Sequence, residues 1–472
     1  MSISFEPNDN DTIGPLMARL EKMLEGEENY FFDVEEFEEL IEFQFFFGDL
    51  ERAGKTISLA LEQHPSTIGF LVKQAQLLLW NNKGENALQL LSSVEAIDPN
   101  NAEIFRTRGA IYSQMNRHND AISELNKAAE VDESEDVGMI YVEIANEYMT
   151  MGLYDKAIDH FHLAINNDFA LDNVLTELGE SYDLGNRLDD GVDYFNKLVN
   201  ESPYNSDAWL SLGLLQYRLE LYEKAIEAYD YSLAIDPAYV AAMLNKANAY
   251  FAMGHYFKAI NTYKEAFEIE EPEAMTIYCM GECYEKLEKY NLAVEKYKKA
   301  LELDETLADA WIGIGVCLGE QGNFDAALRH ILHAVELEPT NAEFWFILAD
   351  TQQSAGHNDD AIQSFRKVAV IEPQNPDIWL EFSHVYAERE EYEMAIDVLN
   401  EGISLQPENA AHYYRLVGYL HFLGKLKEAL LVFGHALQSY YNSYSNLFEY
   451  APLLAEEPAY INLIEQLKPT SE

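Results

Sequence analysis

Small and apolar residues recur along this chain with a period of 34 residues. One position is small in every repeat and holds Ala53, Ala87, Ala121, Ala157, Gly191, Ala225, Ala259, Ala293, Ala327, Ala361, Ala395 and Ala429. Successive members of this series lie 34 residues apart, except for a single step of 36 between Ala121 and Ala157. A fixed period of this length is typical of proteins in which each repeat buries its apolar face against its neighbours. The sequence therefore predicts twelve repeats over residues 34–443.

Each repeat carries two apolar stripes at helical spacing. When the small position is numbered place 20, places 4, 8 and 11 form one stripe and places 20, 24 and 27 the other, because residues three and four apart share a helix face. Place 8 is small in ten repeats, whereas aromatic side chains recur at places 4, 11 and 24. Small residues let two helices approach closely while larger neighbours fill the adjacent gaps. We therefore expect two packed amphipathic helices in every repeat.

Glycine and proline mark the ends of these expected helices. Glycines such as Gly152, Gly254 and Gly322 lie between the two stripes and suit the left-handed residue that follows a helix end. A proline at place 32 closes many repeats, because proline can begin a helix but cannot continue the previous one. These prolines are Pro65, Pro99, Pro203, Pro237, Pro339, Pro373 and Pro407.

The constellation resembles the tetratricopeptide repeat family. The segments "WLSLG" at 209–213 and "AIEAY" at 225–229, followed by Pro237, match its pattern closely, although Gln216 stands where the family has a tyrosine. The resemblance covers residues 34–443 and implies an all-α fold, an α-solenoid in which twelve helix-turn-helix units wind into a right-handed superhelix. It also implies that the first helices of the repeats line a concave groove.

The two ends of the array depart from the pattern. Ile41 and Val417 occupy place 8 in the first and last repeats, where one neighbour is missing, and end repeats usually act as caps. We expect residues 1–33 to form an acidic N-terminal capping helix and residues 444–472 a C-terminal capping helix. The N-terminal stripe consists of Ile13, Leu16, Met17, Leu20, Met23 and Leu24. The two extra residues of the long step fall at 131–138, where we expect the superhelix to bend.

Composition and charge limit the possible partners. Hydrophobic residues make up 48% of the 472, which is ample for a core, and 83 acidic against 31 basic residues give a net charge of −52. Such a charge disfavours nucleic acid and anionic membranes, because both require clustered cations. Three cysteines are too few for a disulfide framework, the first residues carry neither the basic nor the apolar region of a signal peptide, and no apolar run reaches membrane-spanning length. We expect a cytoplasmic protein.

Candidate catalytic or metal-binding groups are weak. Cys279, Cys283 and Cys317 could bring thiolates together on neighbouring helices, but no fourth ligand accompanies them, and buried thiols explain them better. The pairs His330 with His333 and His160 with His162 lack a carboxylate at metal-ligand spacing. No glycine-rich phosphate loop or serine elbow occurs either. The sequence predicts no catalytic residue, no metal site and no cofactor.

The expected binding surface is the groove beside the first stripe, at places 2, 5, 9, 12 and 13. Trp80 is the only one of five tryptophans away from place 4, so packing does not explain it. Aromatic and acidic side chains alternate on this surface, although the aromatic residues could instead seal the joints between repeats, as we expect for Phe45 and Phe46. The candidate binding residues are Trp80, Tyr217, Asn248, Phe251, Tyr278, Glu282, Glu285, Phe346, Asp350, Glu388, Tyr414 and Phe422.

Some members of the family grip an acidic peptide C-terminus with lysine and asparagine. That clamp is not formed here, because Arg106 is the only basic residue at place 5 and Ala110 occupies its companion place. Asn245 and Asn248 would supply amides, but leucines stand where the lysines are needed.

The sequence thus predicts a non-catalytic scaffold that binds a basic or amphipathic protein segment in an acidic, aromatic groove. We expect a monomer or small oligomer that binds neither nucleic acid nor membrane. One alternative is a structural protein that assembles with copies of itself, which the net charge opposes. An enzyme with a hidden site is a further alternative.

Overall fold

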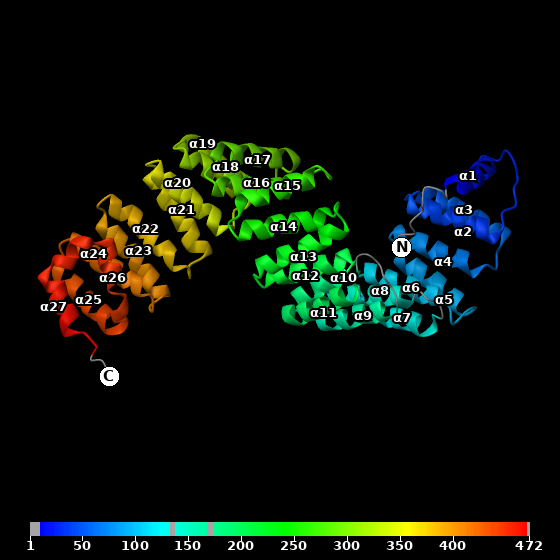
Figure 1. Ribbon diagram of the computed structural model, residues 1–472, viewed down its shortest axis with the longest axis horizontal. Coiled ribbons are helices and arrows are strands. Elements are labelled where there is room, and N and C mark those ends of the chain that lie inside the picture. Colours follow the sequence, from blue (N-terminus) through cyan, green and yellow to red (C-terminus); the bar gives the residue numbers. More distant parts are fainter. Residues whose placement is uncertain (1–9, 133–136, 168–173, 470–472) are drawn as a thin grey trace. The chain divides into compact units, whose positions relative to one another are not determined.

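The computed structural model describes residues 10–132, 137–167 and 174–469, and every regular element in these ranges is helical (Figure 1). The chain divides into two compact modules, the N-terminal module Met1–Ala242 and the C-terminal module Met243–Glu472. Within each module the helices follow one another in chain order, and consecutive helices pack as pairs. This confirms the predicted all-α solenoid of paired helices, whereas its handedness stays a prediction.

The repeats begin and end close to where the hydrophobic pattern places them. In the N-terminal module the helices are α1 (Asn10–Leu24), α2 (Val34–Phe46), α3 (Leu50–Gln63), α4 (Ile68–Trp80), α5 (Gly84–Glu95), α6 (Ala102–Gln114), α7 (His118–Val131), α8 (Val137–Thr150), α9 (Tyr154–Asn166), α10 (Val174–Leu184), α11 (Leu188–Glu201), α12 (Ser206–Arg218) and α13 (Tyr222–Ile235). From α2 onward, even-numbered helices are the first helices of the repeats and odd-numbered helices the second.

The same alternation continues to the end of the array. The remaining helices are α14 (Val240–Ala252), which begins just before the division between the modules, α15 (Tyr256–Phe267), α16 (Ala274–Lys286), α17 (Tyr290–Leu303), α18 (Ala308–Glu320), α19 (Phe324–Leu337), α20 (Ala342–Ser354), α21 (Asn358–Ile371), α22 (Pro376–Glu388), α23 (Tyr392–Leu405), α24 (Ala410–Phe422), α25 (Leu426–Tyr440), η1 (Tyr441–Ser443), α26 (Ser445–Tyr450), η2 (Pro452–Glu456) and α27 (Pro458–Gln466).

Place 8 is small because the side chain of place 24 packs directly onto it. The Tyr297 ring lies between two first helices, where a Cβ atom added to Gly281 would come within 2.6 Å of Cε1 and one added to Gly313 within 2.5 Å of Cε2. Tyr229 packs onto Gly213 in the same way. These rings and the alanines of place 20 are almost fully buried. The small residue at place 8 thus leaves a space between the helices, and one large side chain from the second helix fills it.

In five repeats the aromatic residue at place 4 ties the repeat to the end of the one before it. The indole nitrogens of Trp209, Trp345 and Trp379 donate hydrogen bonds of 2.9 to 3.0 Å to the carbonyl oxygens of prolines at place 32 of the preceding repeat. The acceptors are Pro203, Pro339 and Pro373, and two further joints use Trp311 with Glu305 and Tyr413 with Pro407. Place 4 therefore fixes the loop between repeats in addition to its packing role.

The turn between the two helices has one conformation throughout the array. Its left-handed residue lies at place 15 in all twelve repeats, with φ between 54° and 80°. Glycine fills this place in half of the repeats, but asparagine fills it in three and glutamate in the other three, which are Glu220, Glu288 and Glu390. A glutamate at positive φ is strained, so the packing of the flanking helices determines the turn there.

Helices outside the array cover both of its ends. Leu20 of α1 is buried beside Phe32 and Phe37, and the Arg19 guanidinium lies 4.6 Å from the centre of the Phe32 ring. The C-terminal segment does not form the single helix that we expected. It breaks into α26, η2 and α27, because Pro452 and Pro458 lack the N–H groups that a continuous helix would need.

The bend expected at the two-residue insertion involves residues 133–136, which lie outside the described residues.

Replacing Gly313 with alanine should destabilise the protein by about 1–3 kcal/mol, because its Cβ would overlap the buried Tyr297 ring. Gly319 in the same helix is a matched control, because nothing lies within 4 Å of its added Cβ, and alanine there should stabilise by about 0.5–1 kcal/mol. Urea unfolding of both variants measures the two free energies. Changes of the same sign would show that the ring does not occupy the space beside Gly313.

Replacing Ala293 with leucine should also cost about 1–3 kcal/mol, because the residue is fully buried between the helices of its repeat. Glu295 lies two residues along the same helix and is exposed, so Glu295→Ala should change the unfolding free energy by less than about 0.5 kcal/mol. Thermal or urea unfolding compares the two variants, and equal losses would contradict the assignment of place 20 to the core.

Candidate functional site

A pocket of about 780 Å³ lies along the inner side of four first helices in the N-terminal module. Helices α2, α4, α6 and α8 supply nearly all of its lining, and many of these residues hold places 2, 5, 9, 12 or 13. The lining consists of Glu42, Phe45, Phe46, Lys73, Gln76, Leu79, Trp80, Glu103, Arg106, Thr107, Gly109, Ala110, Ser113, Gln114, Leu125, Glu143, Asn146 and Glu147. We call the surface formed by these places the inner face.

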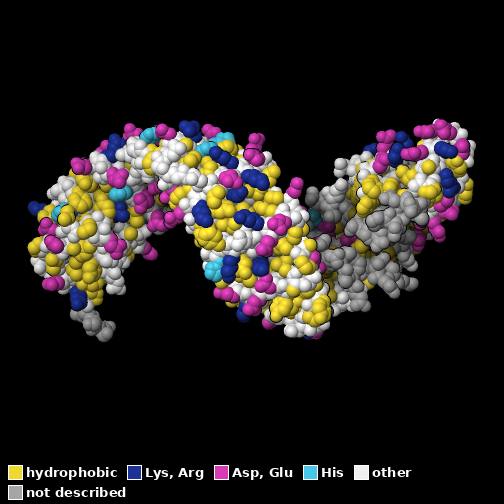
Figure 2. All heavy atoms as spheres, turned by 45° about the horizontal axis from the view of Figure 1, so that its top comes forward, with side chains coloured by type: hydrophobic (Ala, Val, Ile, Leu, Met, Phe, Trp, Pro, Cys, Tyr) yellow, Lys and Arg dark blue, Asp and Glu magenta, His cyan; other side chains and the backbone are white. Residues whose placement is uncertain are grey.

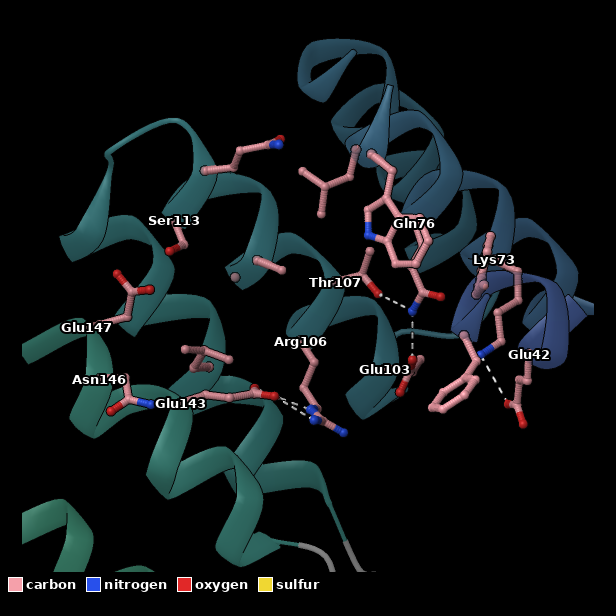
Figure 3. Close-up of a pocket in the computed structure, with 18 residues that line it drawn as sticks. Glu42, Lys73, Gln76, Glu103, Arg106, Thr107, Ser113, Glu143, Asn146 and Glu147 are labelled. Carbon is pink, nitrogen blue, oxygen red and sulfur yellow. Dashed lines mark hydrogen bonds and ion pairs between the residues drawn. The ribbon is translucent and has the colours of Figure 1, made fainter. Parts of the chain in front are cut away.

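Both cations of the pocket are paired with carboxylates from the neighbouring helix (Figure 3). Lys73 Nζ lies 3.3 Å from Glu42 Oε1, and Arg106 Nη2 lies 2.6 Å from Glu143 Oε1. Burial disfavours the charged guanidinium, but the hydrogen bond to Glu143 and the negative charges of Glu143 and Glu103 together outweigh that effect and leave the pKa of Arg106 above its usual value. Neither cation is therefore left to attract an anionic ligand.

Two further carboxylates have no cation from the pocket as a partner. Glu103 accepts a hydrogen bond of 2.9 Å from Gln76 Nε2, which also lies 3.3 Å from Thr107 Oγ1 (Figure 3). Glu147 Oε2 lies 2.7 Å from Nδ1 of His118 on α7. The pocket thus carries four carboxylates against two cations and has an acidic surplus.

Aromatic rings form one edge of this pocket. Trp80 is 46% exposed, and its ring centre lies 4.9 Å from that of Phe45. Phe46 is 49% exposed and lines the pocket, and the adjoining Phe47 is 62% exposed. Phe46 lies on the last turn of α2 with half of its surface exposed, and its expected role in sealing a joint stays a prediction. Trp80 lines the pocket as an exposed ring.

The inner face of the C-terminal module has a different character at α16. Tyr297 donates a hydrogen bond of 2.7 Å to Glu285 Oε2, and the Tyr278 ring centre lies 5.5 Å from that of Tyr297. Burial, with the negative charge of Glu285 nearby, raises the pKa of Glu282 above that of an ordinary carboxyl group. Asn248 of α14 accepts a hydrogen bond from the Tyr263 hydroxyl. Asn248, Glu282 and Glu285 hold places 9, 9 and 12 and are half-buried polar groups of the inner face.

Aromatic residues at place 5 pack against the ring at place 24 of the same repeat. The ring centres are 5.6 Å apart for Phe346 and Phe365 and 6.1 Å apart for Tyr414 and Phe433. Tyr414 has no exposed surface, and its hydroxyl donates to the carbonyl of Tyr440 at 2.8 Å. Its prediction as a binding residue is therefore wrong, because place 5 in the last repeat belongs to the core.

Aromatic residues at places 12 and 13 mostly cover the turn of a repeat. Tyr217 lies edge-on to Tyr222 and Phe251 to Tyr256, each pair with ring centres 5.4 Å apart. Phe422 is 38% exposed and lies 5.7 Å from the Tyr392 ring centre. These contacts fit the joint-sealing alternative, although all three rings keep some exposed surface.

The two remaining acidic candidates are exposed at the inner face. Glu388 accepts a hydrogen bond of 2.7 Å from Gln353 Nε2 across neighbouring repeats. Asp350 lies on α20, in the repeat that supplies Gln353.

The thiols and histidines do not assemble a metal site. Among the described residues, no group of three or more His, Cys, Asp or Glu side chains is placed to hold a metal ion. Cys283 and Cys317 are buried, and burial raises the pKa of each thiol to about 12. His330 and His333 pack on the Trp311 ring, with ring centres 5.4 and 4.6 Å away. In the described part of the chain, no helix is both long and apolar enough to span a membrane.

Several pocket residues were missed from the sequence. Gln76, Glu103 and Asn146 hold places 9, 2 and 9, so the same place rule could have found them. Lys73 and Glu143 hold place 6, which the rule leaves out. Their side chains reach the pocket through ion pairs that cross from one repeat to the next, and a single-repeat pattern does not reveal such pairs.

Comparison with known proteins identifies repeats over much of the chain. Models described as tetratricopeptide or TPR repeat match residues 103–135, 176–240, 281–322, 314–376 and 352–420. A model described as anaphase-promoting complex, cyclosome, subunit 3, matches residues 220–300.

Two curated relatives and one solved structure are similar to this chain. The TPR repeat-containing protein YpiA of Bacillus subtilis is 23% identical over 209 residues, which are 44% of this chain and 49% of that protein. The BBSome complex member BBS4 of Bos taurus is 27% identical over 177 residues, which are 36% of this chain and 32% of that protein. The chain thus spans about half the length of the first relative and a third of the second.

The solved structure is that of the APC/C hetero-tetramer Cut9-Hcn1. It is 15% identical, covers 87% of this chain and 94% of its own, and has a TM-score of 0.41. The matched models and the recurring helix pairs agree on one conclusion. The chain belongs to the tetratricopeptide repeat family.

Proposed function

We propose that this protein is a non-catalytic interaction scaffold that holds a basic or amphipathic protein segment against its inner face. Tetratricopeptide relatives are mostly proteins that bind other proteins, and one relative is by its name a member of a multiprotein complex. Stacked repeats create an extended concave surface, which such proteins use to bind partners.

The observation that carries the proposal is the charge balance of the pocket between α2 and α8. Lys73 and Arg106 already have carboxylate partners, so an incoming segment meets the surplus acids Glu103 and Glu147. Positive side chains of a partner would complement that surplus. An anionic segment would meet like charge, which favours the basic class of partner.

Exposed rings supply the apolar half of the recognition. Trp80, Phe45 and Phe46 lie along one edge of the pocket, within reach of a segment that also contacts its carboxylates. Tryptophan and tyrosine are the side chains that most often dominate binding energy at interfaces. We infer that aliphatic or aromatic side chains of the segment pack on these rings.

The inner face of the C-terminal module offers a second contact region for the same kind of segment. Burial and the negative charge of Glu285 raise the cost of ionising Glu282, and a cation from a partner would relieve that cost. Asp350 and Glu388 extend the acidic surface along α20 and α22. Among the predicted residues, Trp80, Tyr217, Asn248, Phe251, Tyr278, Glu282, Glu285, Phe346, Asp350, Glu388 and Phe422 remain candidates for the contact.

A fluorescein-labelled peptide that alternates lysine with leucine or phenylalanine is a direct probe, and fluorescence anisotropy measures its affinity. Trp80→Ala should weaken binding about tenfold or more, as expected for a central aromatic contact. Glu103→Lys should weaken binding as well, and this loss should shrink at high salt, because exposed charges are screened beyond about 8 Å at physiological ionic strength.

Matched controls lie away from the pocket. Tyr204→Ala removes a ring that is 87% exposed, and Glu201→Lys reverses an exposed charge on a second helix. Both should leave the peptide affinity within about twofold of the unmodified protein. The proposal would be contradicted if the peptide affinity changed neither with salt concentration nor in the Trp80→Ala and Glu103→Lys variants.

A further inference from the structure

Cations gather on one side of four consecutive second helices in the C-terminal module. Places 22, 25 and 26 of α15, α17, α19 and α21 hold six lysine or arginine residues and one histidine, His333, against only two carboxylates, Glu265 and Glu295. We call the six the cationic row: Lys264, Lys298, Lys299, Arg329, Arg366 and Lys367. Figure 2 shows Lys and Arg side chains gathered over the region of α17 and α19. The rest of the chain has a large acidic excess, so this concentration is unusual.

The cationic row is exposed and forms no close ion pair in the described part of the chain, although the charge of Lys299 helps to lower the pKa of Glu295. All six side chains are exposed, and none forms an ion pair within 4.0 Å in the described part of the chain. Elsewhere cations are commonly paired, and Arg187 and Arg389 each contact two carboxylates. Of the two carboxylates on the same places, Glu295 already pairs with Lys296 at 2.8 Å. The charge of the row is therefore available to a ligand.

The centre of the row has a positive local field. His330 packs on Trp311, and burial together with the charges of Lys298 and Arg329 lowers its pKa. No carboxylate offsets these two cations at the His330 ring. The neighbouring His333 lies edge-on to Trp311 with ring centres 4.6 Å apart. Cations and a half-buried indole thus lie side by side on α17, α18 and α19.

We propose that the cationic row is a second binding surface, which docks an acidic segment of a partner protein. Because stacked repeats present equivalent places at regular intervals, an extended acidic segment can meet one or two cations per repeat. The apolar side chains beside the row, including the exposed Leu332 and Val370, would contact the segment between its charges.

The chemistry favours a short acidic polypeptide over other anions. A nucleic acid or an anionic membrane would extend its charge beyond the row and meet the acidic excess of the chain. A flexible segment can confine its carboxylates to the row, because charges further away than about 8 Å are screened at physiological ionic strength. A second copy of the chain would bring its full net charge of −52 with it.

A fluorescein-labelled peptide of glutamate and aspartate with interspersed leucine tests this surface on the full chain by fluorescence anisotropy. The triple variant Lys298→Glu, Lys299→Glu, Arg329→Glu should lose at least about tenfold in affinity. The control variant Lys197→Glu, Lys224→Glu, Lys427→Glu changes the net charge equally at exposed sites elsewhere and should bind within about twofold of the unmodified protein. Circular dichroism verifies that both variants fold.

Two more readouts separate this surface from the inner face. The basic peptide that probes the inner face should bind the row variant as tightly as the unmodified protein. In histidine-labelled protein, the acidic peptide should raise the pKa of His330, because nearby carboxylates stabilise the imidazolium.

Three outcomes would overturn the proposal. The first is an equal loss of affinity for the acidic peptide in both triple variants, or no binding of this peptide to the unmodified protein. The second is a duplex DNA of similar charge that binds more tightly than the peptide. The third is concentration-dependent self-association that only the row variant abolishes in sedimentation, which would make a second copy the occupant.

Discussion

The contact between the side chain at place 24 and the small residue at place 8 holds the inner repeats of the array together. In the repeat of α16 and α17, Tyr297 from the second helix fills the space left by Gly281, and it also touches Gly313 of the next repeat. A single buried ring therefore fixes the spacing of three helices. Because this contact recurs, the helices keep the same rotation from one repeat to the next, and equivalent places face the same side along a module. The pocket and the cationic row both depend on that regularity.

Much of the fold could be predicted from the sequence because the same arrangement of small and aromatic residues recurs from repeat to repeat. The small residues and aromatic rings define both helices, and a period of 34 residues defines their order. The turn was predictable only where glycine occupies it. Glu220 and Glu288 adopt the same left-handed conformation because the packed helices leave the chain no other path. The break of the C-terminal segment follows from Pro452 and Pro458, whose effect outweighs its apolar content.

The candidate site was less predictable, because it depends on contacts between repeats. A rule of places finds the inner face, yet the same place has different surroundings along the array. At place 5, Arg106 lines the pocket, whereas Tyr414 is a core residue that packs against Phe433. Because Arg106 is paired with Glu143, a partner does not meet an unpaired positive charge there, and only the structure shows this ion pair. The array thus carries an acidic surface on first helices and a basic surface on second helices. The net charge of the chain does not reveal this separation.

The hydrogen bond between place 4 and the carbonyl at place 32 has a consequence for how such a chain can evolve. Three consecutive repeats, those of α18, α20 and α22, contain both a donor and an acceptor, as Trp345 and Pro373 show for the repeat of α20. A duplicated copy of one of these repeats therefore arrives with a complete joint on each side, and the deletion of one removes a matched pair. Lineages could lengthen or shorten the array by whole repeats without inventing a new connection.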